Sequence, residues 1–247
     1  MNRKTKDSII KEYRMPTVWC PGCGIGIVFK NLADDFTELG YNSKDTTVIS
    51  GIGCTGRMAG YFNMDTFHTT HGRPIPAAEA VKIYNPKLNV VVVSGDGDLL
   101  SIGGNHLLHA ARRNTDITVI MTNNEVYGMT GGQSAPTIKR GHISQTAPKG
   151  STHDPMNVQP IIVGNKRHFY ARTTVFHLPL LKKCIREALE WKGFSFVEVI
   201  TNCPERFGKM NKMKSPADMI LSFKENYRIN AKPKMMLEEN EIGILKS

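Results

Sequence analysis

Apolar residues along the chain follow two periods, one typical of helices and one of buried strands. In residues 24–39 they recur every three or four positions, which predicts an amphipathic helix. Residues 46–50, 89–94 and 117–121 are runs rich in β-branched side chains, typical of strands buried in parallel sheets. A helical pattern over residues 101–113 separates the last two runs. Strand–helix–strand units of this kind predict an α/β fold with a parallel sheet.

The second half of the chain begins with a segment that has no period. Residues 128–159 are rich in Gly, Ser, Thr, Pro and Lys, and we expect a long functional loop that becomes ordered when a ligand or partner binds. Regular patterns predict helices at residues 76–84 and 178–191 and a strand at residues 195–201.

Length and composition fit one globular domain over residues 1–247. We expect a polar N-terminal arm over about residues 1–16 and a basic C-terminal tail over about residues 205–247. The arm lacks the apolar run of a secretory signal, and the chain has no stretch of 18 apolar residues. These features predict a cytoplasmic protein without membrane contact.

The net charge of +10 indicates anionic partners. No run of Lys and Arg exceeds three residues, and aromatic residues are not interleaved with the basic ones, so we expect no nucleic-acid binding. A basic surface equally suits phosphorylated cofactors, coenzyme A or an acidic protein.

Glycines and acidic residues follow the strand at residues 89–94. Residues 94–98 read S-G-D-G-D, and residues 123–128, at the end of the next strand, read N-N-E-V-Y-G. Ligands in open α/β sheets bind at the carboxyl ends of strands, where glycines let the backbone approach a phosphate. Asp96 and Asn124 offer the oxygen ligands that Mg²⁺ prefers. The two segments predict a magnesium–diphosphate site; the alternative is a tight turn with chance glycines.

Four of the five cysteines form a second candidate site. Cys20 and Cys23 make a C-x-x-C pair, and Cys54 and Cys203 each follow a predicted strand, so both can reach one edge of the sheet. Four thiolates with this spacing suit Zn²⁺ or a [4Fe–4S] cluster equally well. A thioredoxin-like pair is disfavoured because no strand precedes it. Cys184 lies within an amphipathic helix, and we expect it in the core.

Five segments then occur in an order that resembles one enzyme family. They are residues 19–24 (W-C-P-G-C-G), 51–54 (G-I-G-C), 69–73 (T-T-H-G-R), 95–98 (G-D-G-D) and 123–133 (N-N-E-V-Y-G-M-T-G-G-Q). Together they resemble the β subunit of the 2-oxoacid:ferredoxin oxidoreductases, over roughly residues 13–225. The short chain and residues 207–212 (F-G-K-M-N-K) are most similar to the 2-oxoglutarate type, and the branched-chain 2-oxoacid type remains open.

The resemblance implies a thiamine-diphosphate-binding fold, with a mostly parallel sheet and helices on both faces. It implies one [4Fe–4S] cluster held by Cys20, Cys23, Cys54 and Cys203. It implies Mg²⁺ held by Asp96, Asn124 and the carbonyl of Val126. It assigns contacts with thiamine diphosphate to Ile52, Gly53, Cys54, Thr55, His71, Gly72, Gly97, Asp98, Gly128 and Met129. For His71 the alternative is a histidine packed within a loop.

The activity that the resemblance implies is coenzyme-A-dependent oxidative decarboxylation of a 2-oxoacid, with electrons passed through the cluster to ferredoxin. For 2-oxoglutarate the product is succinyl-CoA. In the family, the glutamate that activates thiamine comes from the α subunit, so we expect no catalytic residue in this chain and no activity without that partner; γ and δ subunits are further possible partners. We reject Glu125 for this role because it lies between two expected magnesium ligands.

Substrate choice depends on a cation for the second carboxylate of 2-oxoglutarate. The candidates in this chain are Arg57, Arg73, Lys139 and Arg140, and the α subunit is another source. The chain departs from the family pattern at residues 74–76, at Glu79 and over residues 148–169, which bears on local geometry and substrate rather than on the cofactors.

Two other functions compete with this one. A non-catalytic Cys₄ zinc module on a nucleotide-binding fold explains the cysteines but not the spacing of G-D-G and N-N. A thiamine-dependent decarboxylase without electron transfer leaves four cysteines unexplained.

Overall fold

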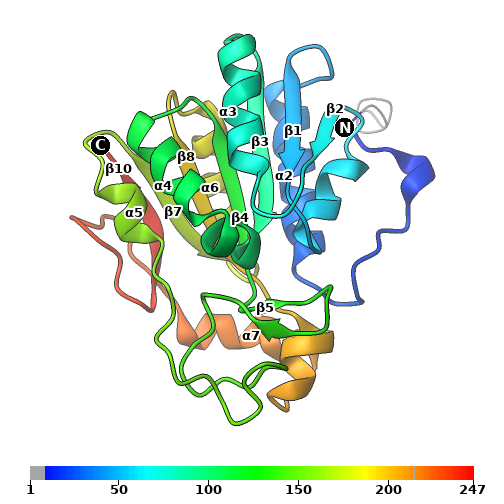
Figure 1. The fold of residues 1–247 in the computed structure, drawn as a ribbon, viewed down its shortest axis with the longest axis vertical. Coiled ribbons are helices and arrows are strands. Elements are labelled where there is room, and N and C mark those ends of the chain that lie inside the picture. Colours follow the sequence, from blue (N-terminus) through cyan, green and yellow to red (C-terminus); the bar gives the residue numbers. More distant parts are fainter. Residues whose placement is uncertain (1–8, 214) are drawn as a thin grey trace.

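The computed structural model describes residues 9–213 and 215–247, which build a central sheet covered by helices on both faces (Figure 1). The sheet has eight strands in the order β2-β1-β3-β4-β8-β7-β10-β9. The strands of this sheet are β1 (Thr46–Ser50), β2 (Asp65–His68), β3 (Asn89–Gly95), β4 (Thr118–Asn123), β7 (Phe169–Thr174), β8 (Ser195–Ile200), β9 (Arg228–Ile229) and β10 (Glu241–Lys246). Neighbours are parallel except β7 and β10, which are antiparallel.

Six α-helices and four short 3₁₀ or π-helical segments surround the strands of the described chain. The α-helices are α2 (Ile25–Leu39), α3 (Pro74–Tyr84), α4 (Gly104–Arg113), α5 (Gln159–Val163), α6 (Leu178–Glu190) and α7 (Pro216–Asn226). The short ones are η1 (Glu12–Arg14), η2 (Thr55–Tyr61), η3 (Asp98–Ile102) and η4 (Pro204–Gly208). The helix expected at residues 101–113 is thus two elements, η3 and α4, and α3 begins at Pro74, where proline's missing N–H costs nothing.

The strands are apolar throughout because both faces of the sheet are buried. In β3, Val91 and Val93 join the core under α2 and α6, whereas Val90 and Val92 join the core under α3 and α4. Successive side chains of a strand point to opposite faces, so a strand between two helix layers needs apolar residues at every position. The expected α/β fold with helices on both faces of a mainly parallel sheet is confirmed.

The carboxyl ends of β1, β3, β4 and β8 lie at one edge of the sheet because these strands are parallel. Beyond this edge lie α7 and the small hairpin of β5 (Val126–Tyr127) and β6 (Gln133–Ser134) (Figure 1). The segment 128–159, expected to order only on binding, has a defined path here: its backbone forms the hairpin and a bridge between Ser144 and Ala147.

One expectation about the chain ends needs revision, and the other falls partly outside the described residues. Residues 205–247 are not a free tail, because β10 pairs with β7 and completes the sheet. The sequence of β10 is E-I-G-I-L-K, which contains a short run of apolar residues. The surrounding region is basic, so its composition did not indicate a strand. Residues 1–8 of the expected polar arm lie outside the described part, and the following Ile9 is buried in the core. No described helix has the length and apolar character that crossing a membrane requires.

Candidate functional site

A cavity of about 230 Å³ lies at the carboxyl edge of the sheet, where the loops after β1, β2, β3 and β4 meet. Every residue expected to contact thiamine diphosphate lines this cavity except Gly72, and all three expected magnesium ligands line it as well. The full lining is Ile52, Gly53, Cys54, Thr55, His71, Gly95, Asp96, Gly97, Asp98, Asn124, Val126, Tyr127, Gly128, Met129 and Thr130. We call it the thiamine cavity.

The chemistry of Asp96 fits a divalent cation. Its side chain is buried, and burial raises the pKa of the carboxyl group to about 6. Hydrogen bonds from Gly97 N (2.9 Å), Glu125 N (3.0 Å) and Thr137 Oγ1 (2.5 Å) oppose that shift and fix the carboxylate. Because a buried carboxylate without a cation is costly, a hard cation held by oxygen ligands suits this position.

Gly97 is required for the close approach of two loops. A Cβ atom at this position would lie 2.3 Å from the ring of Tyr127, closer than any packing allows. The hydroxyl of Tyr127 donates a hydrogen bond to the carbonyl of Gly97 at 3.2 Å. Glycine at position 97 therefore lets the Tyr127 ring pack against residues 95–98, which we expect to bind the diphosphate.

Asp98 connects three loops of the thiamine cavity. Its Oδ1 accepts hydrogen bonds from Ile52 N (3.1 Å), His71 Nδ1 (2.5 Å) and Gly72 N (2.8 Å), and its Oδ2 accepts one from Ser94 Oγ (2.6 Å). An ionised carboxylate can only accept, so Nδ1 of His71 is the donor in this hydrogen bond. Asp98 and Gly72 thus shape the cavity mainly by holding other residues.

His71 is not packed within an apolar loop. Its side chain is 39% exposed, lines the thiamine cavity and meets the ring of Tyr127 edge to face, with ring centroids 6.0 Å apart. This placement favours the expected cofactor contact over the packed alternative.

Glu125 faces away from the thiamine cavity. Its backbone has a φ of +67°, and its carboxylate accepts hydrogen bonds from Lys139 N (3.0 Å) and His142 Nδ1 (2.6 Å). It is absent from the cavity lining. Its side chain holds the following loop through these two hydrogen bonds.

Four thiols line a second cavity, of about 460 Å³, which we call the thiol cavity. Cys20 and Cys23 precede α2, Cys54 follows β1, and Cys203 follows β8. A Cβ atom on Gly128 would lie 3.4 Å from Cys203 Sγ and 3.6 Å from Cys54 Sγ, so glycine leaves the space between these thiols open. Cys184 lies in α6 and is fully buried in the core, as expected.

The thiols of this cavity need a cationic group to become thiolates. Burial, and then repulsion between neighbouring thiolates, raises the pKa of Cys23 to about 12 and that of Cys54 to about 11. Among the described residues, no three His, Cys, Asp or Glu side chains form a group able to hold a metal ion. The four cysteines line one cavity, and a set of four thiols suits either Zn²⁺ or an iron–sulfur cluster.

The two cavities are neighbours. Cys54, Asn124, Gly128 and Met129 line both. A group bound in the thiol cavity would thus share a wall with a cofactor in the thiamine cavity.

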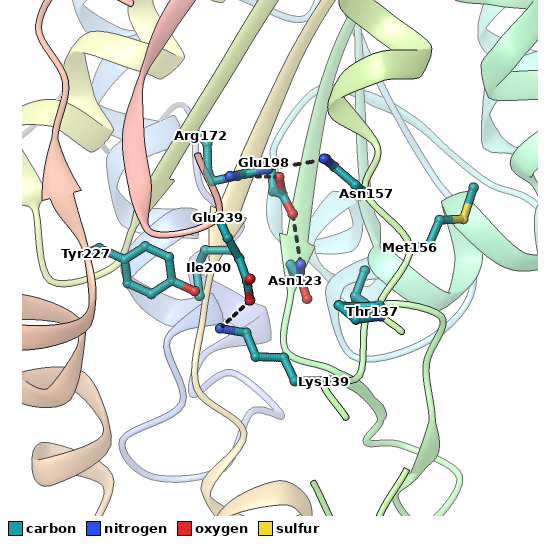
Figure 2. Close-up of a pocket in the computed structure, with 11 residues that line it drawn as sticks. Asn123, Thr137, Lys139, Met156, Asn157, Arg172, Glu198, Ile200, Tyr227 and Glu239 are labelled. Carbon is teal, nitrogen blue, oxygen red and sulfur yellow. Dashed lines mark hydrogen bonds and ion pairs between the residues drawn. The ribbon is translucent and has the colours of Figure 1, made fainter. Parts of the chain in front are cut away.

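Of the four candidate cations, three have partners elsewhere. Arg73 donates to the carbonyls of Gly72 and Ile102, and Arg140 pairs with Asp154 at the surface. Lys139 lies in a different cavity and approaches Glu239 at 3.8 Å (Figure 2).

Arg57 is the remaining candidate. It is exposed, and its guanidinium makes no hydrogen bond or ion pair within the described part of the chain. It lines a cavity of about 800 Å³ that shares Met129 with the thiamine cavity.

Sequence reasoning missed the cavity that holds Lys139, at the carboxyl ends of β4, β7 and β8. Figure 2 shows its buried polar wall, in which Glu198 accepts from Asn123 Nδ2 (2.8 Å) and from Arg172 Nε (3.0 Å). Although burial opposes it, the Arg172 guanidinium holds the pKa of Glu198 below its usual value. Thr137 lines this cavity too and was also missed, because no local pattern links it to Asp96, 41 residues earlier.

Comparison with known proteins gives concordant matches. Residues 51–199 match the family model described as thiamine pyrophosphate enzyme, C-terminal TPP binding domain. The chain is 43% identical to 2-oxoglutarate synthase subunit KorB of Methanothermobacter thermautotrophicus, over 94% of this chain and 81% of that protein. It is 44% identical to the KorB subunit of Methanocaldococcus jannaschii, over 95% of this chain and 87% of that protein.

A solved structure is also similar. It is 2-oxoglutarate:ferredoxin oxidoreductase from Magnetococcus marinus with 2-oxoglutarate, coenzyme A and succinyl-CoA bound. The TM-score is 0.86 at 29% identity, and the match covers all of this chain and 86% of that one.

Proposed function

The chain belongs to the β subunits of the 2-oxoacid:ferredoxin oxidoreductases. From this premise we propose that it works with an α subunit to convert 2-oxoglutarate and coenzyme A into succinyl-CoA and carbon dioxide. Two electrons pass to ferredoxin. The observation that carries this proposal is the shared wall of the two cavities, in which Cys54 lines both. Oxidation by a one-electron acceptor requires the acceptor to lie close to the cofactor.

Thiamine diphosphate is the cofactor of this family domain, and it supplies the electron sink on which a 2-oxoacid loses carbon dioxide. The protein's part is to hold it. The glycine-rich turns after β1 and β3 offer backbone N–H groups, and His71 presents a ring fixed by Asp98. Asp96, Asn124 and the carbonyl of Val126 would hold Mg²⁺, whose charge compensates the diphosphate and the buried carboxylate.

Cys20, Cys23, Cys54 and Cys203 would hold one [4Fe–4S] cluster, which supplies one-electron acceptance. Its charge would keep the thiols ionised, although burial raises the pKa values of Cys23, Cys54 and Cys203. Cys20 is exposed, whereas Cys203 is buried, so the cluster would have one side near solvent. That side is the natural exit for electrons to ferredoxin.

Arg57 is our choice for recognition of the second carboxylate of 2-oxoglutarate. Its guanidinium has no partner among residues 9–213 and 215–247 and lies in a cavity next to the thiamine cavity, and such a group binds a carboxylate with charge-assisted hydrogen bonds. The other candidates are engaged with carbonyls or carboxylates.

The partner α subunit would supply the glutamate that activates thiamine, because Glu125, the candidate inside the motif, is engaged outside the cavity. We therefore propose that this chain is inactive alone. Additional γ and δ subunits are part of this proposal, and the subunit content of the native complex tests them.

The test is coenzyme-A-dependent reduction of a viologen dye by the intact complex, purified without oxygen and supplied with 2-oxoglutarate. Activity that requires coenzyme A and both subunits is the expected result. Activity with 2-oxoisovalerate or pyruvate alone would keep the reaction class and overturn the substrate. A complex that contains cluster and cofactor yet acts on no 2-oxoacid would overturn the function.

A further inference from the structure

A short segment, residues 135–139, lies across the loop that carries the expected magnesium ligands, and we call it the strap. Every second residue of the strap makes one hydrogen bond to this region. Ala135 N donates to the carbonyl of Glu125 (3.0 Å), Thr137 Oγ1 to Asp96 Oδ2 (2.5 Å), and Lys139 N to Glu125 Oε2 (3.0 Å). The strap thus contacts the expected magnesium ligand Asp96 directly. It also contacts Glu125, which lies between the expected ligands Asn124 and Val126 in the chain.

The bonds to Glu125 hold an uncommon backbone conformation. Glu125 has a φ of +67°, in the left-handed region that residues other than glycine rarely adopt. Its N–H donates to Asp96 Oδ2 at 3.0 Å, a geometry that depends on this turn of the backbone. The strap accordingly fixes both donors that reach this oxygen of Asp96.

The two oxygens of Asp96 are used unequally. Oδ2 accepts two hydrogen bonds, from Thr137 and Glu125, whereas Oδ1 accepts only one, from Gly97 N at 2.9 Å. A carboxylate oxygen has two lone-pair sites, so Oδ1 keeps acceptor capacity. The donors on Oδ2 orient the side chain and leave the other oxygen to meet a cation.

Thr137 contacts Asp96 but does not line the thiamine cavity. It is 4% exposed and lines the cavity drawn in Figure 2, next to Lys139, whereas Asp96 lines the thiamine cavity. A residue in this place cannot touch a diphosphate in the thiamine cavity. It acts on the cofactor only through Asp96.

We propose that Thr137 is a positioning residue for the magnesium ligand Asp96, an inference that rests on the proposed thiamine diphosphate and Mg²⁺ site. The hydroxyl holds the carboxylate in the orientation that binds the cation. Removing hydrogen-bond partners of this kind weakens metal binding by about 10-fold to 100-fold in other metal sites.

The test compares variants of the intact complex for the Mg²⁺ concentration that half-saturates thiamine diphosphate binding, measured by equilibrium dialysis. Thr137→Val removes the hydroxyl at nearly constant volume and should raise this concentration about tenfold. Thr137→Ser keeps the hydroxyl and should restore it to within about threefold of the wild-type value. Thr137→Ala gives the same readout if valine prevents assembly.

Thr173→Val is the matched control. Thr173 is fully buried in β7, and its hydroxyl has no partner among the described residues, so its loss should leave the Mg²⁺ requirement unchanged. A merely structural role of Thr137 would lower the melting temperature without moving the Mg²⁺ midpoint.

A wild-type midpoint in Thr137→Val, or equal loss in Thr137→Val and Thr137→Ser, would overturn this inference while leaving the proposed function in place. A wild-type complex that binds no thiamine diphosphate, or binds it without Mg²⁺, would overturn the proposed site and this inference together.

Discussion

His71 and Asp98 are joined by a hydrogen bond of 2.5 Å from Nδ1 to Oδ1, although 27 positions separate them in the chain. The same oxygen accepts the N–H groups of Ile52 and Gly72. One carboxylate therefore fixes the loops that follow β1, β2 and β3. The shape of the thiamine cavity therefore depends on Asp98, whose carboxylate accepts four hydrogen bonds from the protein.

Asp98→Asn should damage both the fold and cofactor binding. The amide nitrogen introduced at position 98 would face hydrogen-bond donors that a carboxylate oxygen of Asp98 now accepts from. A hydrogen bond to a charged group contributes about 1.5–3 kcal/mol to stability. A loss of about 2 kcal/mol lowers the melting temperature by about 4–8 °C in a chain of this size. We also expect thiamine diphosphate affinity to fall at least about tenfold, as seen when partners of binding groups are removed.

Differential scanning calorimetry of the complex and a cofactor titration measure these two effects. Asp154→Asn is the control, because Asp154 forms only an exposed ion pair with Arg140 and should change neither. Cofactor affinity that is unchanged in Asp98→Asn would contradict the role given to this carboxylate.

Cys203→Ser should abolish the iron–sulfur cluster. Serine cannot replace a thiolate ligand to iron, so the purified complex should lose its brown colour and its bound iron and sulfide. The matched control is Cys184→Ser, which alters a cysteine buried in the core away from the thiol cavity and should keep full iron content. Zinc in place of iron in the anaerobic wild-type protein would support the zinc module instead.

Glu125→Gln should leave measurable turnover in the complex. The amide oxygen can still accept from Lys139 N, but the charge-assisted bond from His142 is weakened. Loss of one such bond costs about 1.5 kcal/mol, so turnover should fall by no more than about tenfold. Steady-state viologen reduction measures it. A complex that retains its thiamine diphosphate but has no turnover would identify Glu125 as the activating glutamate after all.

Mg²⁺ binding should weaken as the pH falls below 6. Burial raises the pKa of Asp96 to about 6, and a metal ligand must lose its proton. Below this pH each Mg²⁺ displaces one proton, so apparent affinity should fall about tenfold per pH unit, and above pH 7 it should be constant.

In the metal-free protein, ionisation of Asp96 lowers the stability of the fold, so a rise in pH that favours Mg²⁺ binding reduces this stability. Because the folded pKa of Asp96 exceeds the ordinary value of 3.8, its contribution to stability is fully present below pH 3.8 and is lost as the pH rises through 6. Added Mg²⁺ and thiamine diphosphate should therefore raise the melting temperature more at pH 7.5 than at pH 5.5. An equal increase at both values would contradict the raised pKa.

Arg57→Gln should raise the KM for 2-oxoglutarate. Loss of a charge-assisted bond to the second carboxylate costs about 1.5–3 kcal/mol, which corresponds to a 10-fold to 100-fold increase. A 2-oxoacid without that carboxylate should be affected little. Arg140→Gln is the control, since Arg140 pairs with Asp154 at the surface. An unchanged KM for 2-oxoglutarate would assign recognition to the α subunit.

Much of the candidate site followed from local sequence patterns. Glycine-rich turns at strand ends placed Asp96 and Asn124 together because parallel strands bring their carboxyl ends to one edge. The same rule brought Cys54 and Cys203 together, and the C-x-x-C spacing brought in the other two thiols. These relations depend on strand direction alone, which the apolar runs indicate.

The strand β10 shows where local patterns fail. It is short, lies in a basic region and gains stability by pairing with β9 and with β7, whose paired residues lie 71 to 77 positions earlier in the chain. Strand formation in such a segment depends on its partner more than on its own propensity.

Contacts between distant side chains were decided only by the tertiary structure. The hydrogen bond from Thr137 to Asp96, the four donors on Asp98 and the place of Arg57 in a cavity beside the thiamine cavity have no sequence signature. Sequence by itself determined the fold class, the strand-end motifs and the thiol set, because each depends on local periodicity or spacing. Orientation of the ligands and choice among the cations depend on which side chains meet across the folded chain, and only the tertiary structure brings those together.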